Sequence, residues 1–326
     1  MRRADIVGVM KRVAVLNDYQ NVALSSADWS GLDDRVAVTV FDHHIADPDA
    51  LVAALEGFEI VVAMRERTAF PRSVLERLEA LELLVTTGPR NAVISDTDCA
   101  DLGITYCGTG GQVHSTAELT WALILACARH VPTEVANVRS GGWMTTVGAD
   151  LHGATLGLCG LGRIGGMVAE VGKAFGMELI AWSQNLTPQR CQEVGAELVT
   201  KDDLLARSDF LTVHLVLSER TKALMAEAEL RAMKSTAWLV NTSRGPICDE
   251  DMLARACAEG WIAGAGLDAY GVEPLPPDHP FRTLSNVVAT PHVGYVSKRV
   301  YQIFFADIVE DITGFLDGSP VREIKP

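Results

Sequence analysis

The sequence predicts an α/β fold with two doubly wound parallel-sheet domains, and three observations support this prediction. The chain has 326 residues, which at roughly 150 residues per domain suggests two domains. Apolar residues make up 48% of the chain and charged residues 21%, as in globular proteins. Short apolar runs alternate with helical patterns from about residue 12 almost to the end, which is typical of strands joined by helices in parallel sheets.

The first third of the chain predicts a small flavodoxin-like sheet. Helical patterns separate its apolar runs; in residues 48–55, for example, Asp47 can cap the helix and Pro48 suits its first position. The strand candidates are residues 13–16, 36–41, 60–64, 83–86 and 104–106.

The middle of the chain predicts a second sheet of the Rossmann type. Residues 119–128 are apolar all round, which predicts a helix buried between layers. A new strand–helix series follows, as expected for a dinucleotide-binding sheet. Its strand candidates are residues 155–159, 178–182, 210–215, 237–241, 264–268 and 286–289.

The end of the chain predicts a long amphipathic helix without a strand of its own. Its apolar residues recur at a spacing of three to four: Tyr301, Phe304, Phe305, Ile308, Ile312 and Phe315. We expect this helix to return to the first domain and make that domain discontinuous. The prediction is a substrate domain of residues 1–113 and 297–326, with a dinucleotide-binding domain of residues 114–296 inserted into it.

The charge of the chain limits its partners. Acidic residues outnumber Lys and Arg by 42 to 28, which gives a net charge of −14. Such a surface disfavours nucleic acids and anionic membranes as partners. An anionic small molecule therefore needs a local positive site.

The sequence also favours a cytoplasmic location. Its longest strongly apolar run, residues 119–128, is too short to cross a bilayer. Residues 1–12 predict a short N-terminal extension, because they lack the apolar stretch of a secretory signal. The seven cysteines are scattered without a C-x-x-C pair, so we expect buried thiols and no metal site.

A glycine-rich turn predicts a dinucleotide site. Residues 160–165 read G-L-G-R-I-G and lie between an apolar strand and an amphipathic helix. Gly160 permits the tight turn, Gly162 lets the backbone approach a pyrophosphate, and Gly165 allows close helix–strand packing. We expect Arg163 and Ile164 to contribute to the same site, because the free N–H groups of a helix N-terminus bind anions.

The adenosine end of this site leaves the choice between NAD and NADP open. NAD-binding proteins usually carry an acidic residue about 20 positions after the turn. Here Ser183, Gln184 and Asn185 occupy this region, and no acid lies between Glu178 and Glu193. The missing carboxylate removes repulsion against a 2′-phosphate, and Arg190 is close enough in sequence to reach one. The pattern leans toward NADP or use of both cofactors.

Three further motifs follow predicted strands, where an open parallel sheet places its chemistry. They are N-T-S-R-G-P at 241–246, L-D-A-Y-G-V-E-P at 267–274 and A-T-P-H-V-G at 289–294. Together with the glycine turn they resemble the D-isomer-specific 2-hydroxyacid dehydrogenase family. The resemblance extends from about residue 12 to the C-terminus.

The resemblance implies hydride transfer between NAD(P)H and a small 2-oxoacid or D-2-hydroxyacid, such as glyoxylate or hydroxypyruvate. It assigns His292 as the acid/base, Glu273 as the carboxylate that orients it and favours the imidazolium, and Arg244 as the substrate-binding guanidinium. It also implies that His214, Thr242 and Asp268 line the cofactor site, and that the protein forms a homodimer. Val216 departs from the family, which usually has proline two positions after the histidine.

The loop at residues 88–91, which corresponds to the substrate-binding loop of the family, departs more clearly from the family pattern. Relatives often carry G-x-G-x-D-N, whereas this chain has Gly88-Pro89-Arg90-Asn91. We expect Arg90, with Arg65 and Gly88, to bind an anionic substrate and to add positive charge facing Arg244. The alternative is that these arginines are ordinary solvated loop residues.

A second function class stays open at this stage. A dinucleotide-sensing regulatory protein of the corepressor type would share the fold and retain Arg244, Glu273 and His292. The acidic surface and the lack of a long disordered tail argue against it.

Overall fold

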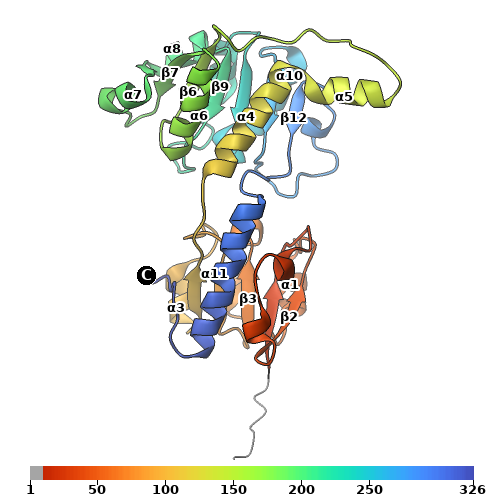
Figure 1. The fold of residues 1–326 in the computed structure, drawn as a ribbon, viewed down its shortest axis with the longest axis vertical. Helices are drawn as coiled ribbons and strands as arrows, with labels where there is room; N and C mark the ends of the chain where they lie inside the picture. Colours follow the sequence, from red (N-terminus) through yellow and green to blue (C-terminus); the bar gives the residue numbers. More distant parts are fainter. Residues whose placement is uncertain (1–9) are drawn as a thin grey trace, which may run out of the picture. The chain divides into compact units, whose positions relative to one another are not determined.

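The structure, a computed structural model, describes residues 10–326, so the first nine residues of the predicted N-terminal extension lie outside it. The chain separates into two compact units, drawn in Figure 1. Unit 1 comprises the residues up to Gln112 together with Ser297–Pro326, and unit 2 comprises Val113–Val296.

Unit 1 is built on a five-stranded parallel sheet with the order β2-β1-β3-β4-β5, which is the flavodoxin-like order. Its strands are β1 (Lys11–Val15), β2 (Val36–Val40), β3 (Ile60–Ala63), β4 (Leu83–Thr86) and β5 (Thr105–Gly108). Its shorter helices are α1 (Pro48–Ala54), α2 (Arg72–Leu75) and α3 (Asp96–Asp101). Strands β3 and β4 are buried along their whole length, as expected for central strands covered on both faces.

The C-terminal helix α11 (Lys298–Leu316) packs on the sheet of unit 1. It buries the apolar stripe that the spacing predicts, including Tyr301, Phe305 and Ile308. The helix also buries Asp311, whose carboxylate accepts a hydrogen bond from the Arg322 guanidinium at 2.9 Å. Residues from both ends of the chain therefore share one core.

Unit 2 is built on a seven-stranded parallel sheet with the order β12-β11-β10-β9-β6-β7-β8. Read from β8 to β11 this is the Rossmann order, extended by β12 at one edge. The strands are β6 (Thr155–Cys159), β7 (Glu178–Trp182), β8 (Glu197–Leu198), β9 (Phe210–Val213), β10 (Trp238–Asn241), β11 (Gly264–Leu267) and β12 (Val287–Ala289). The fold class predicted from the sequence is confirmed.

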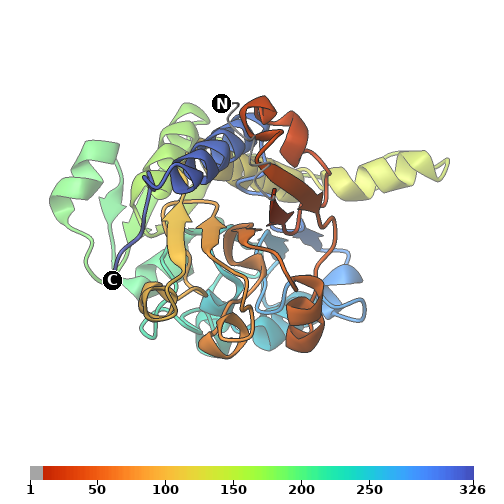
Figure 2. The ribbon, with the colours of Figure 1, turned by 90° about the horizontal axis from the view of Figure 1, so that it is seen from below.

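Helices cover both faces of this sheet. They are α4 (His114–Ala128), α5 (Val131–Arg139), α6 (Arg163–Ala174), α7 (Pro188–Val194), α8 (Lys201–Arg207), α9 (Glu227–Ala232) and α10 (Glu250–Glu259). Helix α4 contacts α6, β10 and β11 and buries Trp121, Leu123 and Ile124. The prediction that it is buried between layers holds only in part, because Leu125 is 37% exposed. Helix α5 and the residues after it project away from the rest of unit 2, as Figure 2 shows.

The structure differs from the predicted elements at some strand ends. Strand β9 ends at Val213 although the apolar run continues to Leu217, and β5 extends to Gly108, which pairs with Thr86. Strand β8 was not predicted, because its two residues are exposed and one of them is acidic. The seven cysteines are buried and free, as expected.

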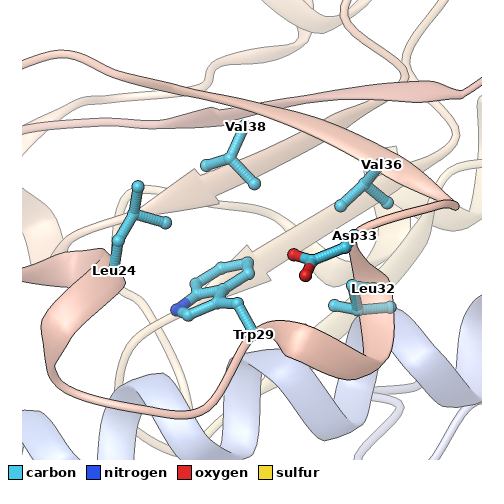
Figure 3. Close-up of a pocket in the computed structure, with 6 residues that line it drawn as sticks. All are labelled: Leu24, Trp29, Leu32, Asp33, Val36 and Val38. Atoms are coloured by element: carbon cyan, nitrogen blue, oxygen red, sulfur yellow. The ribbon is translucent and has the colours of Figure 1, made fainter.

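A cavity of about 340 Å³ lies in unit 1 beside the edge strand β2 (Figure 3). It is lined by Leu24, Trp29, Leu32, Asp33, Val36 and Val38. None of these is a predicted site residue, so the cavity is separate from the motifs.

Candidate active site

The three motifs begin at one edge of the unit 2 sheet. Strands β10, β11 and β12 are neighbours, and their last residues Asn241, Leu267 and Ala289 pair in register. The loops that follow them carry Arg244, Glu273 and His292. The sheet therefore places the origins of all three loops side by side at its carboxyl edge.

His292 and Glu273 form a close pair. The Nδ1 atom of His292 lies 2.6 Å from Oε2 of Glu273, and the two side chains are 17% and 24% exposed. The other carboxylate oxygen of Glu273 accepts the backbone N–H of Tyr270 at 2.9 Å. With one oxygen fixed by its own loop, the carboxylate has a set orientation and in turn orients the imidazole.

Asp268 holds the loop that carries His292. Its carboxylate accepts hydrogen bonds from the Thr290 hydroxyl at 2.6 Å and from the backbone N–H groups of Val293 and Gly294 at 2.8 and 2.7 Å. The residue is 1% exposed, and burial raises the pKa of the Asp268 carboxyl against these hydrogen bonds. The bonded groups lie on both sides of His292 in the chain. They hold His292 in a backbone conformation with a φ of 54°, in the left-handed region.

The Arg244 loop is fixed by its own strand end. The Asn241 side chain donates to the carbonyl of Arg244 at 2.9 Å and accepts the N–H of Ser243 at 3.0 Å. The following residue, Gly245, packs directly on the next loop, since a Cβ there would lie 2.2 Å from the carbonyl carbon of Tyr270. The Arg244 and Glu273 loops are thus packed backbone to backbone.

The glycine turn leaves an open backbone surface before α6. Gly160 has a φ of 102°, and a Cβ at Gly165 would lie 2.3 Å from the carbonyl oxygen of Gly160. At Gly162, by contrast, no atom lies within 4 Å of an added Cβ, and no side chain caps the helix there. Free amide groups beside open space fit the pyrophosphate of a dinucleotide.

His214 lies next to this turn. Its carbonyl oxygen would be 2.7 Å from a Cβ at Gly160, and its ring approaches Gly165. Burial lowers the pKa of His214 to about 4, so the ring is neutral at physiological pH. Within residues 10–326, neither buried ring nitrogen has a hydrogen-bond partner, which fits a ligand group at this position.

The remaining predicted cofactor residues also lie at the carboxyl edge. Ser183, Gln184 and Asn185 follow β7, and Thr242 follows β10 and shares a 2.8 Å hydrogen bond with Thr120. Arg190 bonds to the outside of the glycine turn, because its guanidinium donates to the carbonyl of Leu161 at 3.0 Å and pairs with Glu193 at 2.9 Å.

The three predicted substrate residues lie in unit 1. The Arg65 guanidinium lies over Gly88 and donates to the carbonyl of Thr87 at 3.1 Å. Arg90 is 73% exposed and points to Asp96 at 3.3 Å, so the structure groups Gly88 with Arg65 and leaves Arg90 apart.

Two residues that the sequence analysis did not single out help to build the site. Gly245 permits the close approach of the two loops, and Glu250, at the start of α10, accepts the N–H of Gly271 at 2.8 Å. In the sequence, the acid pair Asp249–Glu250 is typical of the start of a helix. This pattern gives no sign that Glu250 also contacts the loop at Gly271. Across residues 10–326 no cluster of side chains suits a metal ion, and no helix has the length and apolar character needed to cross a membrane.

Comparison with known proteins identifies the family. Residues 121–294 match the NAD binding domain of the D-isomer specific 2-hydroxyacid dehydrogenases. The glyoxylate reductase of Aeropyrum pernix is 44% identical over 235 residues, covering 69% of this chain and 70% of that protein. The D-3-phosphoglycerate dehydrogenase of Archaeoglobus fulgidus is 39% identical over 215 residues, covering 65% of this chain and 41% of the relative.

Solved structures of related proteins support the same family. The phosphoglycerate oxidoreductase of Vibrio cholerae O395 superposes with a TM-score of 0.91 at 33% identity, covering 95% of this chain and 100% of that one. These relatives are named as enzymes, so the comparisons do not favour the regulatory alternative. The chain belongs to the D-isomer specific 2-hydroxyacid dehydrogenase family and is a dehydrogenase of D-2-hydroxyacids that uses NAD or NADP.

Proposed function

We propose that this enzyme works as a reductase of a small 2-oxoacid, with His292 as the proton donor. The observation that carries the proposal is the 2.6 Å contact between His292 Nδ1 and Glu273 Oε2. It holds the imidazole in one orientation, and an imidazole is a side chain that can donate a proton to a carbonyl oxygen near neutral pH. The bound cofactor supplies the hydride.

Arg244 binds and polarises the substrate in this proposal. A guanidinium forms two parallel hydrogen bonds with a carboxylate, which positions the oxoacid for reaction. The loop contacts of Asn241 and Gly245 support this role, because they fix the backbone from which the Arg244 side chain extends.

The cofactor site is formed by unit 2, the dinucleotide-binding domain of this proposal. Gly160, Gly162, Arg163, Ile164 and Gly165 bind the pyrophosphate. Ser183, Gln184 and Asn185 bind the adenosine ribose, and His214, Thr242 and Asp268 lie toward the nicotinamide. The open surface at Gly162 and the unpartnered ring of His214 within residues 10–326 support this assignment.

Unit 1 is the substrate domain. Gly88, Arg65 and Arg90 contribute to binding of the anionic substrate, with Arg65 favoured over Arg90 because its guanidinium already lies beside Gly88. The names of the relatives point to two substrate classes, the short oxoacid glyoxylate and the phosphorylated hydroxyacid 3-phosphoglycerate. We propose glyoxylate, hydroxypyruvate or a similar short oxoacid as the substrate.

NADP, or both cofactors, is the proposed preference. Support comes from the loop after β7, where Ser183, Gln184 and Asn185 carry no negative charge that would repel a 2′-phosphate. Arg190 lies near the glycine turn but is already paired with Glu193 at 2.9 Å, so the proposal rests on the uncharged loop and not on this arginine.

The protein is proposed to act as a homodimer. The segment from α5 to residue 147 exposes large apolar side chains, among them Trp143 at 72% and Val147 at 94%. Four hydrogen bonds from Thr145 and Thr146 to one oxygen of Glu134 hold this segment in a defined shape. An ordered apolar projection of this kind suits burial against a second copy.

The test is a steady-state assay of reduced-cofactor absorbance with a panel of 2-oxoacids, each with NADH and NADPH. We expect turnover of glyoxylate or hydroxypyruvate and its loss in His292→Gln. Tight binding of the cofactor without turnover of any oxoacid would refute the proposal.

A further inference from the structure

The first residue of α10 connects two of the catalytic loops. Glu250 lies six positions after Arg244 along the chain, and Asp249 caps the helix by accepting the N–H of Met252 at 3.1 Å. The Glu250 side chain accepts the N–H of Gly271, in the loop after β11, at 2.8 Å. Its second oxygen would lie 3.0 Å from a Cβ at Gly271.

The peptide group that Glu250 holds is the one next to the Glu273 contact. The N–H of Tyr270 goes to Glu273, and the N–H of Gly271 goes to Glu250. Two carboxylates therefore hold two consecutive amides. The same stretch of backbone lies against Gly245, the residue after Arg244.

We propose that Glu250 is a positioning residue for catalysis, whose carboxylate ties the segment carrying Arg244 to the loop carrying Glu273. The inference rests on the proposed roles of Arg244, Glu273 and His292. If the tie is lost, the Gly271 amide loses its carboxylate partner, and the loop is held from outside by the Gly245 contact and by the hydrogen bond of the Tyr270 hydroxyl to the Thr290 carbonyl at 2.9 Å. Glu273 then orients His292 less closely, and small displacements of a catalytic group cost activity steeply.

The surroundings of Glu250 agree with this role. Burial raises the pKa of the Glu250 carboxyl, and the negative charges of Glu273 and Asp251 raise it further. The hydrogen bond from Gly271 and the nearby His279 act in the opposite direction and lower the pKa. A half-buried carboxylate near a second carboxylate is electrostatically unfavourable, so its position needs a compensating interaction. The Gly271 amide supplies that interaction.

Three variants separate the hydrogen bond from the charge. Glu250→Gln retains an acceptor of the same length, Glu250→Asp retains the charge but is one methylene shorter, and Glu250→Ala removes both. Asp251→Asn is the matched control, because Asp251 is the next residue of α10 and is exposed. Circular dichroism and thermal melting establish that each variant is folded.

We expect kcat to fall roughly tenfold in Glu250→Ala and in Glu250→Asp while the KM for the cofactor stays within about twofold. Glu250→Gln and Asp251→Asn should retain wild-type kcat to within about threefold. Equal kcat in Glu250→Ala and wild type would overturn the proposal. So would a Glu250→Gln variant as impaired as Glu250→Ala, since that result would make the charge the cause. Glu250→Asp decides the matter if Glu250→Ala does not fold.

A readout without turnover distinguishes failure of this inference from failure of the proposed function. The short contact of His292 Nδ1 with Glu273 predicts a far-downfield imidazole proton resonance in wild type, assigned by its loss in His292→Gln. We expect Glu250→Ala to lose or broaden this resonance and Glu250→Gln to retain it. If the wild type turned over no oxoacid, this comparison would still test the tie. An unchanged resonance in Glu250→Ala would refute it.

Discussion

Glu273 is held by two partners at once, the imidazole of His292 at 2.6 Å and the backbone N–H of Tyr270 at 2.9 Å. One oxygen faces the proposed proton donor and the other faces its own loop. Because each oxygen has its own partner, the carboxylate cannot rotate without losing a hydrogen bond.

The first prediction concerns the charge of Glu273. Glu273→Gln keeps the size of the side chain but removes the negative charge that lies beside the His292 ring. We expect kcat for oxoacid reduction to fall roughly 100-fold with little change in melting temperature. Glu259→Gln on α10, which alters an exposed carboxylate paired with Arg255, is the control. Unchanged kcat in Glu273→Gln would remove Glu273 from the mechanism.

A second prediction tests the contact between the Arg244 and Glu273 loops. A Cβ at position 245 would lie 2.2 Å from the carbonyl carbon of Tyr270, so Gly245→Ala must push the two loops apart. We expect kcat/KM for the oxoacid to fall at least about tenfold. Gly31→Ala is the matched control, since no atom lies within 4 Å of a Cβ there. Similar kinetics in both variants would show that the contact does not position the site.

A third prediction concerns the pH dependence of stability. Burial raises the pKa of the Asp311 carboxyl from 3.8 to about 6. The folded protein thus binds this proton more tightly than the unfolded chain, and the resulting stabilisation is lost as pH rises from about 4 through 6. Asp311→Asn does not titrate. Its free energy of unfolding relative to wild type should therefore increase by up to about 3 kcal/mol between pH 4 and pH 7.

Urea unfolding of both proteins across this pH range measures the difference. Glu310→Gln removes an exposed carboxylate that pairs with the same arginine, Arg322, and should show little of this pH dependence. A difference between Asp311→Asn and wild type that is constant with pH would contradict the assignment.

The fourth prediction addresses cofactor choice. Gln184→Asp places a carboxylate in the loop after β7, where it would repel a 2′-phosphate. We expect KM for NADPH to rise about tenfold or more while KM for NADH stays constant or falls. Gln189→Asp, which adds the same charge on α7, controls for general electrostatics. Equal effects on both cofactors in Gln184→Asp would place the adenosine ribose elsewhere.

Much of the fold follows directly from the sequence. The inner strands of both sheets are short, apolar and buried on both faces, so runs such as residues 83–86 and 155–159 stand out. The glycine turn can also be recognised in the sequence. Its glycines have the spacing that the tight turn requires, and the turn lies between an apolar strand and an amphipathic helix. Strand β8 could not be recognised, since an exposed two-residue edge strand leaves no apolar run.

The site was predictable only in part. The motifs identify the candidate catalytic residues, but they do not show which other groups fix the positions of those residues through hydrogen bonds and packing. Asp268 was expected to contact the cofactor, and its two oxygens accept three hydrogen bonds from the His292 loop. Glu250 and Gly245 contact a loop more than 20 positions away in the chain, and no local sequence pattern reports such contacts.

The hydrogen bonds from the His292 loop to Asp268 determine which substitutions in this loop are compatible with its conformation. Its attachment points are one threonine hydroxyl and two main-chain amides, so the side chains of Pro291 and Val293 are not among them. Libraries that vary Val293 should retain the loop geometry, whereas Pro291 also fixes its own backbone φ directly before His292. Inserting or deleting a single residue between Thr290 and Val293 would change the spacing of these attachment points, and such length variants should lose activity.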